Sequence, residues 1–157
     1  MDEFSALYRR YAPDVFRFAL HLSRDRHEAE DITSETFVRA WTSPEPIRLA
    51  TVKGYLFAIA RNLFLQRQRK RRRNVALEEE LRDPGQDPLA RVEQSSQIHA
   101  VLDGVRRLPE IDRSALLMRA RDGMAYAEIA QALGITLASV KVKIHRARIA
   151  LLALKDA

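Results

Sequence analysis

Hydrophobic positions near the start of the chain recur at the spacing of a helix. Phe4, Leu7, Tyr8 and Tyr11 fall at i, i+3, i+4 and i+7, which places them on one helical face. Pro13 follows and predicts a helix boundary or a new first turn, because proline lacks the amide proton that a helix interior uses. Strand-like alternation of Val, Ile and Thr is scarce, and the chain has only 5 glycines. The pattern predicts an all-α fold.

The first half of the chain is expected to hold three or four helices. In residues 27–41, the positions predicted to face inward are Ala29, Ile32, Phe37, Ala40 and Trp41. The run from Ser43 to Pro46 ends this helix, since a residue that precedes proline avoids helical conformation. A last helix is predicted from about Val52 into a basic run that ends at Arg73. Its apolar members are Tyr55, Leu56, Ile59, Leu63 and Phe64.

The second half of the chain predicts four helices. The first runs from about Gln97 to Leu108, and Pro109 breaks it. In the next helix, Asp112 has the side chain of a good N-cap and Gly123 suits the position just after the C-terminus. Two short helices joined by a tight turn are expected to follow.

These last two helices have the spacing of a helix-turn-helix. Ala130 is small enough for a close helix crossing, Gly134 suits a turn with positive φ, and Thr136 suits an N-cap. The inward face of the second helix is marked by apolar residues that recur at helical spacing, namely Val140, Ile144, Ala147 and Leu151. Such a unit places its second helix in the major groove of DNA.

The opposite face of that helix carries Val142 at its centre and cations on its flanks. Small or shape-complementary side chains toward the bases, with lysine and arginine toward the phosphates, are typical of a groove-reading helix. A solvated amphipathic helix is the alternative. It explains the cations but leaves Val142 and Ile149 exposed without a partner. The layout favours DNA recognition, with Val142 placed to meet a thymine methyl group.

Charge divides the chain into three parts. Residues 1–73 carry a net charge of +6, residues 74–96 a net charge of −4, and residues 97–157 a net charge of +4. The middle part also contains Pro84, Gly85 and Pro88. It is predicted to be a flexible acidic linker between two small basic helical domains, rather than a surface loop within one domain. The overall charge of +6 favours a polyanionic partner.

Composition excludes several classes of function. The chain has no cysteine, so it has no disulfide, thiolate metal site or cysteine nucleophile. Its Asp, Glu and His residues show no metal-ligand spacing and no HExxH motif, and it has no P-loop, so neither a cofactor nor enzymatic activity is expected. No apolar run reaches 18 residues and no signal-peptide pattern opens the chain, which predicts a cytoplasmic protein.

Four stretches of the chain resemble the sigma-70 family, specifically its extracytoplasmic-function (ECF) group. The run from Leu108 to Leu151 is similar to region 4 of that family, with its Glu-Ile-Ala, Leu-Gly-Ile and His-Arg-Ala-Arg elements. The stretches "FSALYRRYAPDVFRFA", "EAEDITSETFVRAW" and "VKGYLFAIARNLFLQRQRKRRR" are similar to region 2. The resemblance covers about residues 4–73 and 100–152 in the family's order.

The resemblance implies a promoter-recognition subunit of bacterial RNA polymerase. Its partners would be core RNA polymerase (through the clamp coiled coil and the flap), promoter DNA and an anti-sigma factor. Region 2 would bind the clamp and melt the −10 element, and region 4 would read the −35 element. A free-standing regulator is the rival interpretation, but residues 1–73 show neither a dimerisation seam nor a ligand pocket.

The family motifs assign site residues to positions of this chain. The −35 contacts would be Thr136, Ser139, Lys141, Val142, Lys143, His145, Arg146 and Arg148. The −10 contacts would be Tyr55, Arg61, Asn62, Arg67, Arg69 and Lys70. The polymerase contacts would be Asp31, Glu35 and Arg39. The chain departs from the family where a serine is usual, at Val142 and at the helix cap Ala125, and in the base-selecting loop 43–51.

Overall fold

The computed structural model describes residues 3–43, 51–78 and 97–155, and these residues form seven α-helices without a strand. The all-α prediction is therefore confirmed. The base-selecting loop between Ser43 and Thr51 and most of the predicted linker lie outside the described residues. Helix α3 continues to Glu78, beyond the predicted domain boundary at residue 73. No helix in the described part of the chain is long and apolar enough to span a membrane.

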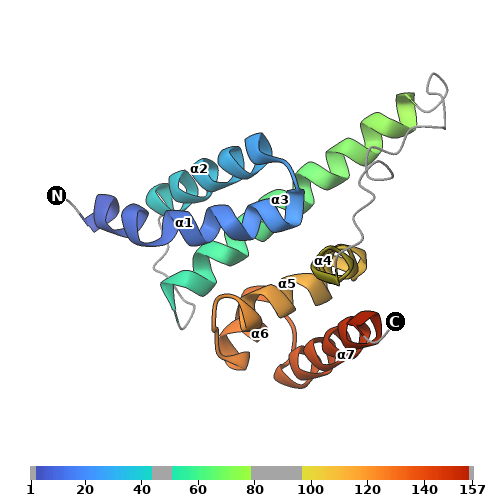
Figure 1. Ribbon diagram of the computed structural model, residues 1–157. Coiled ribbons are helices and arrows are strands. Elements are labelled where there is room, and N and C mark those ends of the chain that lie inside the picture. Colours follow the sequence, from blue (N-terminus) through green and yellow to red (C-terminus); the bar gives the residue numbers. More distant parts are fainter. Residues whose placement is uncertain (1–2, 44–50, 79–96, 156–157) are drawn as a thin grey trace.

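The N-terminal module consists of α1 (Glu3–Ser23), α2 (Arg26–Thr42) and the long α3 (Val52–Glu78), which lie against one another in Figure 1. The α2 helix begins at an N-cap, Asp25, whose carboxylate accepts a hydrogen bond from the backbone N–H of Glu28 at 3.2 Å. Phe18 of α1 stacks on Phe57 of α3 with ring centroids 4.6 Å apart, and both rings are buried. This aromatic contact joins α3 to α1, and α3 also packs on α2.

The C-terminal module consists of α4 (Gln97–Arg107), α5 (Glu110–Ala120), α6 (Tyr126–Leu133) and α7 (Leu137–Lys155). The four-helix prediction for this half of the chain is confirmed. Its core is built from apolar residues of α5, α6 and α7, including Ala115, Met118, Ile129, Leu133, Val140, Ile144 and Ala147.

The two modules share one hydrophobic core, because the N-terminal part of α3 packs on α6 and α1 touches α5 (Figure 1). Gly54 permits the close approach. A Cβ atom at this position would lie 3.3 Å from Thr51 Oγ1 and 3.6 Å from Met124 Cε, so there is little room for a side chain between α3 and the C-terminal module.

Three expectations from the sequence are wrong. Pro13 lies inside α1, which runs unbroken to Ser23, because apolar side chains on both sides of the proline pack on α2 and α3. Trp41 is 61% exposed rather than buried; it lies in the last turn of α2, and its ring meets only the edge of the core at Phe4, 4.5 Å away. Asp112 is not an N-cap, since α5 begins at Glu110, and its carboxylate is buried against α7.

Candidate nucleic-acid interface

The turn between α6 and α7 has the geometry that the sequence predicted. Gly134 ends α6 with φ +68°, a left-handed conformation that favours glycine, and its N–H donates to the carbonyl groups of Ala130 and Gln131. Thr136 caps α7, because its Oγ1 accepts a hydrogen bond from the backbone N–H of Ser139 at 3.1 Å. The structural roles predicted for Gly134 and Thr136 are therefore confirmed.

The inward face of α7 fixes its angle on the module. Val140, Ile144 and Ala147 are fully buried, and Val140 and Ile144 belong to the same apolar cluster as Ile129 and Leu133 of α6. Burial of a full branched side chain contributes roughly 1.5–3 kcal/mol to the stability of the fold. These buried residues therefore resist rotation of α7 about its axis. The outward face is therefore presented in one fixed orientation.

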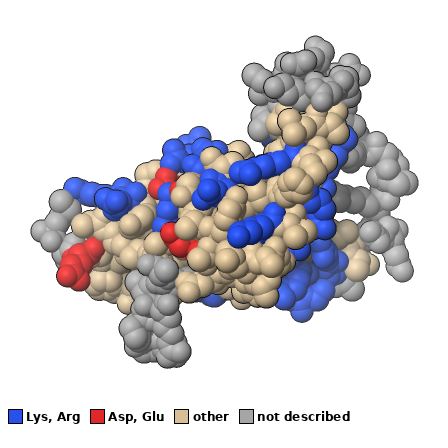
Figure 2. All heavy atoms as spheres, turned by 90° about the horizontal axis from the view of Figure 1, so that it is seen from below, with Lys and Arg blue, Asp and Glu red and all other residues tan. Residues whose placement is uncertain are grey.

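That outward face is exposed and mixes apolar and basic side chains. Val142 is 60% exposed, and Lys141, His145 and Arg148 are exposed around it. Figure 2 shows the whole molecule from below, the side on which α6 and α7 lie in Figure 1, and on this side of the molecule lysine and arginine outnumber acidic residues. This is the arrangement required for a helix that lies in the groove of a polyanion.

Two cations of α7 share a buried carboxylate. Arg146 donates from Nε to Asp112 Oδ2 at 3.0 Å and from Nη2 to Oδ2 at 2.8 Å and to Oδ1 at 3.0 Å. The Nζ of Lys143 lies 4.0 Å from Asp112 Oδ1. The predicted −35 residues Arg146 and Lys143 are thus linked to α5, a contact that the sequence did not reveal.

A second exposed face runs along α3. Tyr55, Asn62 and Arg69 recur at intervals of seven residues, which keeps them close to one line on a helix. Asn62 and Arg69 are exposed, as is the neighbouring Lys70, whereas Tyr55 is half-buried against the core. The exposed amide of Asn62 carries two donors and one acceptor in this line.

Arg61 lies apart from this face. Its Nε donates to Glu110 Oε1 at 2.6 Å and its Nη2 donates to Glu110 Oε2 at 2.9 Å, across the boundary between the two modules. Ser114 also donates to the same carboxylate, at 2.8 Å. The structure therefore separates Arg61 from the other residues assigned to the −10 element.

Arg67 joins the residues assigned to polymerase binding. Its guanidinium lies 3.9 Å from Asp31 and 3.7 Å from Glu35, and Glu35 also pairs with Arg39 at 3.2 Å. These four side chains form one charge cluster between α2 and α3. An adjacent cavity of about 430 Å³ is lined by Glu35, Gln66, Arg67, Lys70, Arg71 and Asn74.

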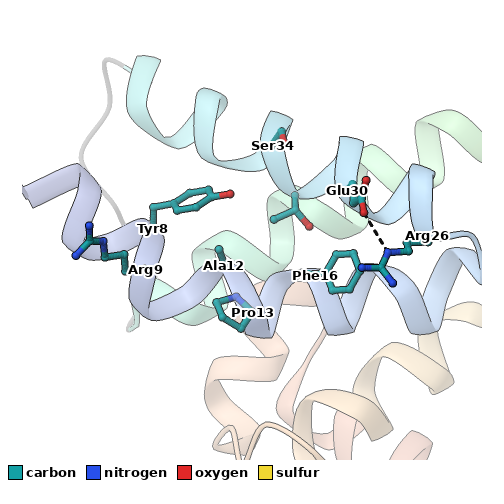
Figure 3. A pocket seen from close by; sticks show the side chains of 9 residues that line it. Tyr8, Arg9, Ala12, Pro13, Phe16, Arg26, Glu30 and Ser34 are labelled. Atoms are coloured by element: carbon teal, nitrogen blue, oxygen red, sulfur yellow. Dashed lines mark hydrogen bonds and ion pairs between the residues drawn. The ribbon is translucent and has the colours of Figure 1, made fainter.

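Another groove lies between α1 and α2 (Figure 3). Its volume is about 590 Å³. The α1 side is lined by Tyr8, Arg9, Ala12, Pro13 and Phe16, and the α2 side by Arg26, Glu30, Thr33 and Ser34. Arg26 and Glu30 pair with each other at 3.2 Å along its wall.

Sequence reasoning missed three acidic residues that organise these surfaces. Glu110 and Asp112 hold Arg61 and Arg146, and the buried Glu28 pairs with Arg71. Each pair joins positions that are distant in sequence, so no local spacing marks it. The sequence suggested a capping role for Asp112, and a cap would have been satisfied locally.

Comparison with known families assigns both modules. Residues 7–74 match the family "Sigma-70 region 2", and residues 98–151 match the family "Sigma-70, region 4". The chain belongs to the sigma-70 family. The resemblance inferred from the sequence motifs is therefore confirmed, and the order of the two regions is the one expected.

Curated relatives of this sigma factor are ECF RNA polymerase sigma factors. The chain is 37% identical over 153 residues to SigE of Mycolicibacterium smegmatis, covering 94% of this chain and 60% of the relative. It is 34% identical over 148 residues to SigM of Bacillus subtilis, covering 90% of this chain and 88% of the relative. The chain thus spans most of the length of SigM but less than two thirds of the length of SigE.

Solved structures share the arrangement of helices. The sigma factor RpoE from Bartonella quintana, in complex with the anti-sigma factor NepR, matches with a TM-score of 0.80 at 24% identity and covers 100% of this chain and 99% of its own. The structure of CnrH in complex with the cytosolic domain of CnrY matches with a TM-score of 0.70 at 26% identity, covering 98% of this chain and 87% of its own.

Proposed function

We propose that this sigma factor directs core RNA polymerase to promoters by reading the −35 element with α7 and the −10 element with α3. The single observation that carries the proposal is the fixed outward face of α7, where an exposed Val142 lies among cations. The function proposed for the protein is promoter binding rather than catalysis, and the protein would act in the cytoplasm together with RNA polymerase.

At the −35 element, the outward face of α7 provides both kinds of contact that sequence-specific binding requires. Val142 offers an apolar surface to a thymine methyl group, and Ser139 and His145 offer polar groups to base edges. Lys141, Lys143, Arg146 and Arg148 provide the positive charge for phosphates, and the N-terminus of α7 at Thr136 adds backbone donors.

At the −10 element, the exposed line on α3 supplies the contacts. Asn62 suits the edge of an extruded base, and Tyr55 provides an aromatic ring beside it. Arg69 and Lys70 are exposed and can meet phosphates of the same DNA strand. Arg61 and Arg67 are held by carboxylates of α5 and α2, so they join the DNA only after those pairs open.

Protein partners follow from the charge cluster and from the relatives. Asp31, Glu35 and Arg39 present an acidic surface with one cation, which suits a basic coiled coil such as the polymerase clamp. The α7 module is proposed to meet the polymerase flap. Because RpoE and CnrH were each solved with a protein partner, and the partner NepR is an anti-sigma factor, an anti-sigma factor is proposed for this chain as well.

Transcription by a reconstituted holoenzyme tests the proposal. Core polymerase with and without the purified chain would transcribe a library of genomic promoter fragments, and the transcript starts would be mapped. We expect a set of starts that needs the chain and shares two upstream elements. An Asn62→Ala variant should reduce open-complex formation while −35 binding is retained. Starts that are the same with and without the chain would favour the rival, a regulator that does not require polymerase binding.

A further inference from the structure

Asp112 of α5 is a buried acidic side chain that binds α7 through Arg146. Its carboxylate is 1% exposed, yet the side chain of Arg146 that it binds is 58% exposed. A buried carboxylate is costly unless it is paired, and here both oxygens accept from one guanidinium. The pair therefore has a buried end in α5 and an accessible end on the surface of α7.

The accessible end of this pair still carries donors. A guanidinium has five N–H groups in a rigid plane, and Asp112 engages the Nε and Nη2 nitrogens. The Nη1 donors take no part in this contact, and the Arg146 side chain as a whole is 58% exposed. Because two nitrogens are fixed to a buried group, the plane of the fork is fixed as well, and its remaining donors keep one direction.

We propose that Asp112 is a positioning residue for −35 recognition, which orients the Arg146 fork before DNA binds. The inference rests on the proposed function, in that Arg146 must contact −35 DNA. Pre-orientation lowers the entropy lost when a flexible side chain binds, so the gain is largest for a DNA sequence that matches the fixed fork. Asp112 thereby favours the matched promoter over other DNA.

The negative charge of Asp112 also favours the matched promoter over other DNA. Asp112, Arg146 and Lys143, whose ammonium lies 4.0 Å from the carboxylate, together carry a net charge of +1 rather than +2. Attraction to any DNA grows with the number of phosphates that the protein neutralises. The carboxylate of Asp112, which is buried against α7, thus weakens the binding of DNA regardless of its sequence.

Asp112→Asn tests the proposal in the holoenzyme of the full chain. The affinity for a mapped promoter duplex is compared with that for the same duplex carrying a replaced −35 element, each over a range of salt concentrations. We expect the ratio of the two affinities to fall about tenfold or more, which corresponds to the loss of one well-oriented bidentate contact. Affinity for the replaced duplex should stay the same or rise, and its salt slope should steepen by up to about 1.

Matched variants separate positioning from other causes. Asp103→Asn removes an equal charge from an exposed residue of α4 that pairs with Arg106 at 3.5 Å, and it should leave the ratio unchanged. Arg146→Lys keeps the charge but removes the fork, so it should lower the ratio with no change in slope. If Asp112→Asn does not fold, Arg146→Lys still measures the loss of the oriented guanidinium, because this variant leaves the Asp112 carboxylate in place.

The outcomes are distinct. Equal losses of affinity for both duplexes in Asp112→Asn would mean that the residue only supports the fold, and the proposal would be overturned. An unchanged ratio in Asp112→Asn, together with a reduced ratio in Arg146→Ala, would overturn the positioning role alone. An unchanged ratio in Arg146→Ala would overturn the −35 contact of Arg146 and the positioning role together.

Discussion

The guanidinium of Arg61 in α3 and the carboxylate of Glu110 in α5 form a two-point ion pair, at 2.6 and 2.9 Å, that joins region 2 to region 4. Their side chains are only 13% and 17% exposed. A hydrogen bond between Thr51 and Glu128 at 2.8 Å lies along the same boundary. In this arrangement Glu110 engages the Arg61 guanidinium at two points, so the −10 contact proposed for Arg61 requires the pair to open.

Removal of this pair is expected to loosen the contact between the two modules. Glu110→Ala leaves Arg61 without its partner, and the loss of a charged hydrogen bond costs about 2 kcal/mol. Because the chain has no cysteine, Ala6→Cys and Ala150→Cys can carry spin labels on α1 and α7. The distribution of distances between the labels should become longer and broader. Glu30→Ala, which removes an exposed carboxylate of α2, serves as the control, and identical distributions in both variants would refute the expectation.

Val142→Ser should alter the base preference within the −35 element. The exposed valine offers methyl groups that suit a thymine, and a serine hydroxyl changes that contact to a polar one. Promoter libraries randomised in the −35 element would report the change at one position, with overall affinity little altered.

Lys141→Ala provides the comparison for Val142→Ser, because Lys141 is exposed beside it and is assigned to phosphate. It should weaken all −35 sequences alike and flatten the salt slope by about 1. If both variants lost affinity uniformly, Val142 would not be reading a base.

Ala125→Ser should stabilise the helix-turn-helix. Ala125 occupies the N-cap of α6 in an extended conformation and provides no side-chain hydrogen bond. A serine hydroxyl there can accept from a free N–H of the first turn, which contributes about 1 kcal/mol. Urea unfolding should therefore shift to a higher midpoint. Ala127→Ser, within α6, is the control and should not raise stability.

Acidification should weaken the contact between α1 and the C-terminus of α5. Burial lowers the pKa of His21, and the nearby positive charges of Arg121 and Arg106 lower that pKa further. The unfolded chain therefore binds a proton more readily than the folded chain. The stabilisation is fully present above the ordinary pKa of about 6.5, and it is lost as pH falls from there through the lowered pKa.

Thermal unfolding between about pH 8 and pH 5 measures this effect of acid. His21→Gln should show a shallower fall in stability below about pH 6.5, since its side chain does not titrate. His27→Gln is the control, because His27 is exposed on α2. A fall of the same size in the parent chain and in His21→Gln would rule out His21 as the group responsible.

The sequence predicted local features of the recognition site well. Gly134, Thr136 and the buried row of Val140, Ile144 and Ala147 follow from helical periodicity and turn chemistry, which depend on neighbours in the chain. The same logic failed at Pro13, because packing on both sides of the proline outweighs one lost hydrogen bond.

Only the tertiary structure decided which charged residues are paired. Arg146 and Asp112 are 34 positions apart, and Arg61 and Glu110 are 49 positions apart, so no periodic pattern links either pair. The sequence by itself determined most of the helices and the helix-turn-helix, since these depend on short-range spacing, and its motifs carried the resemblance to the two sigma regions. The folded chain determined which arginines are exposed for DNA and which are held by a carboxylate, because that depends on where distant helices meet.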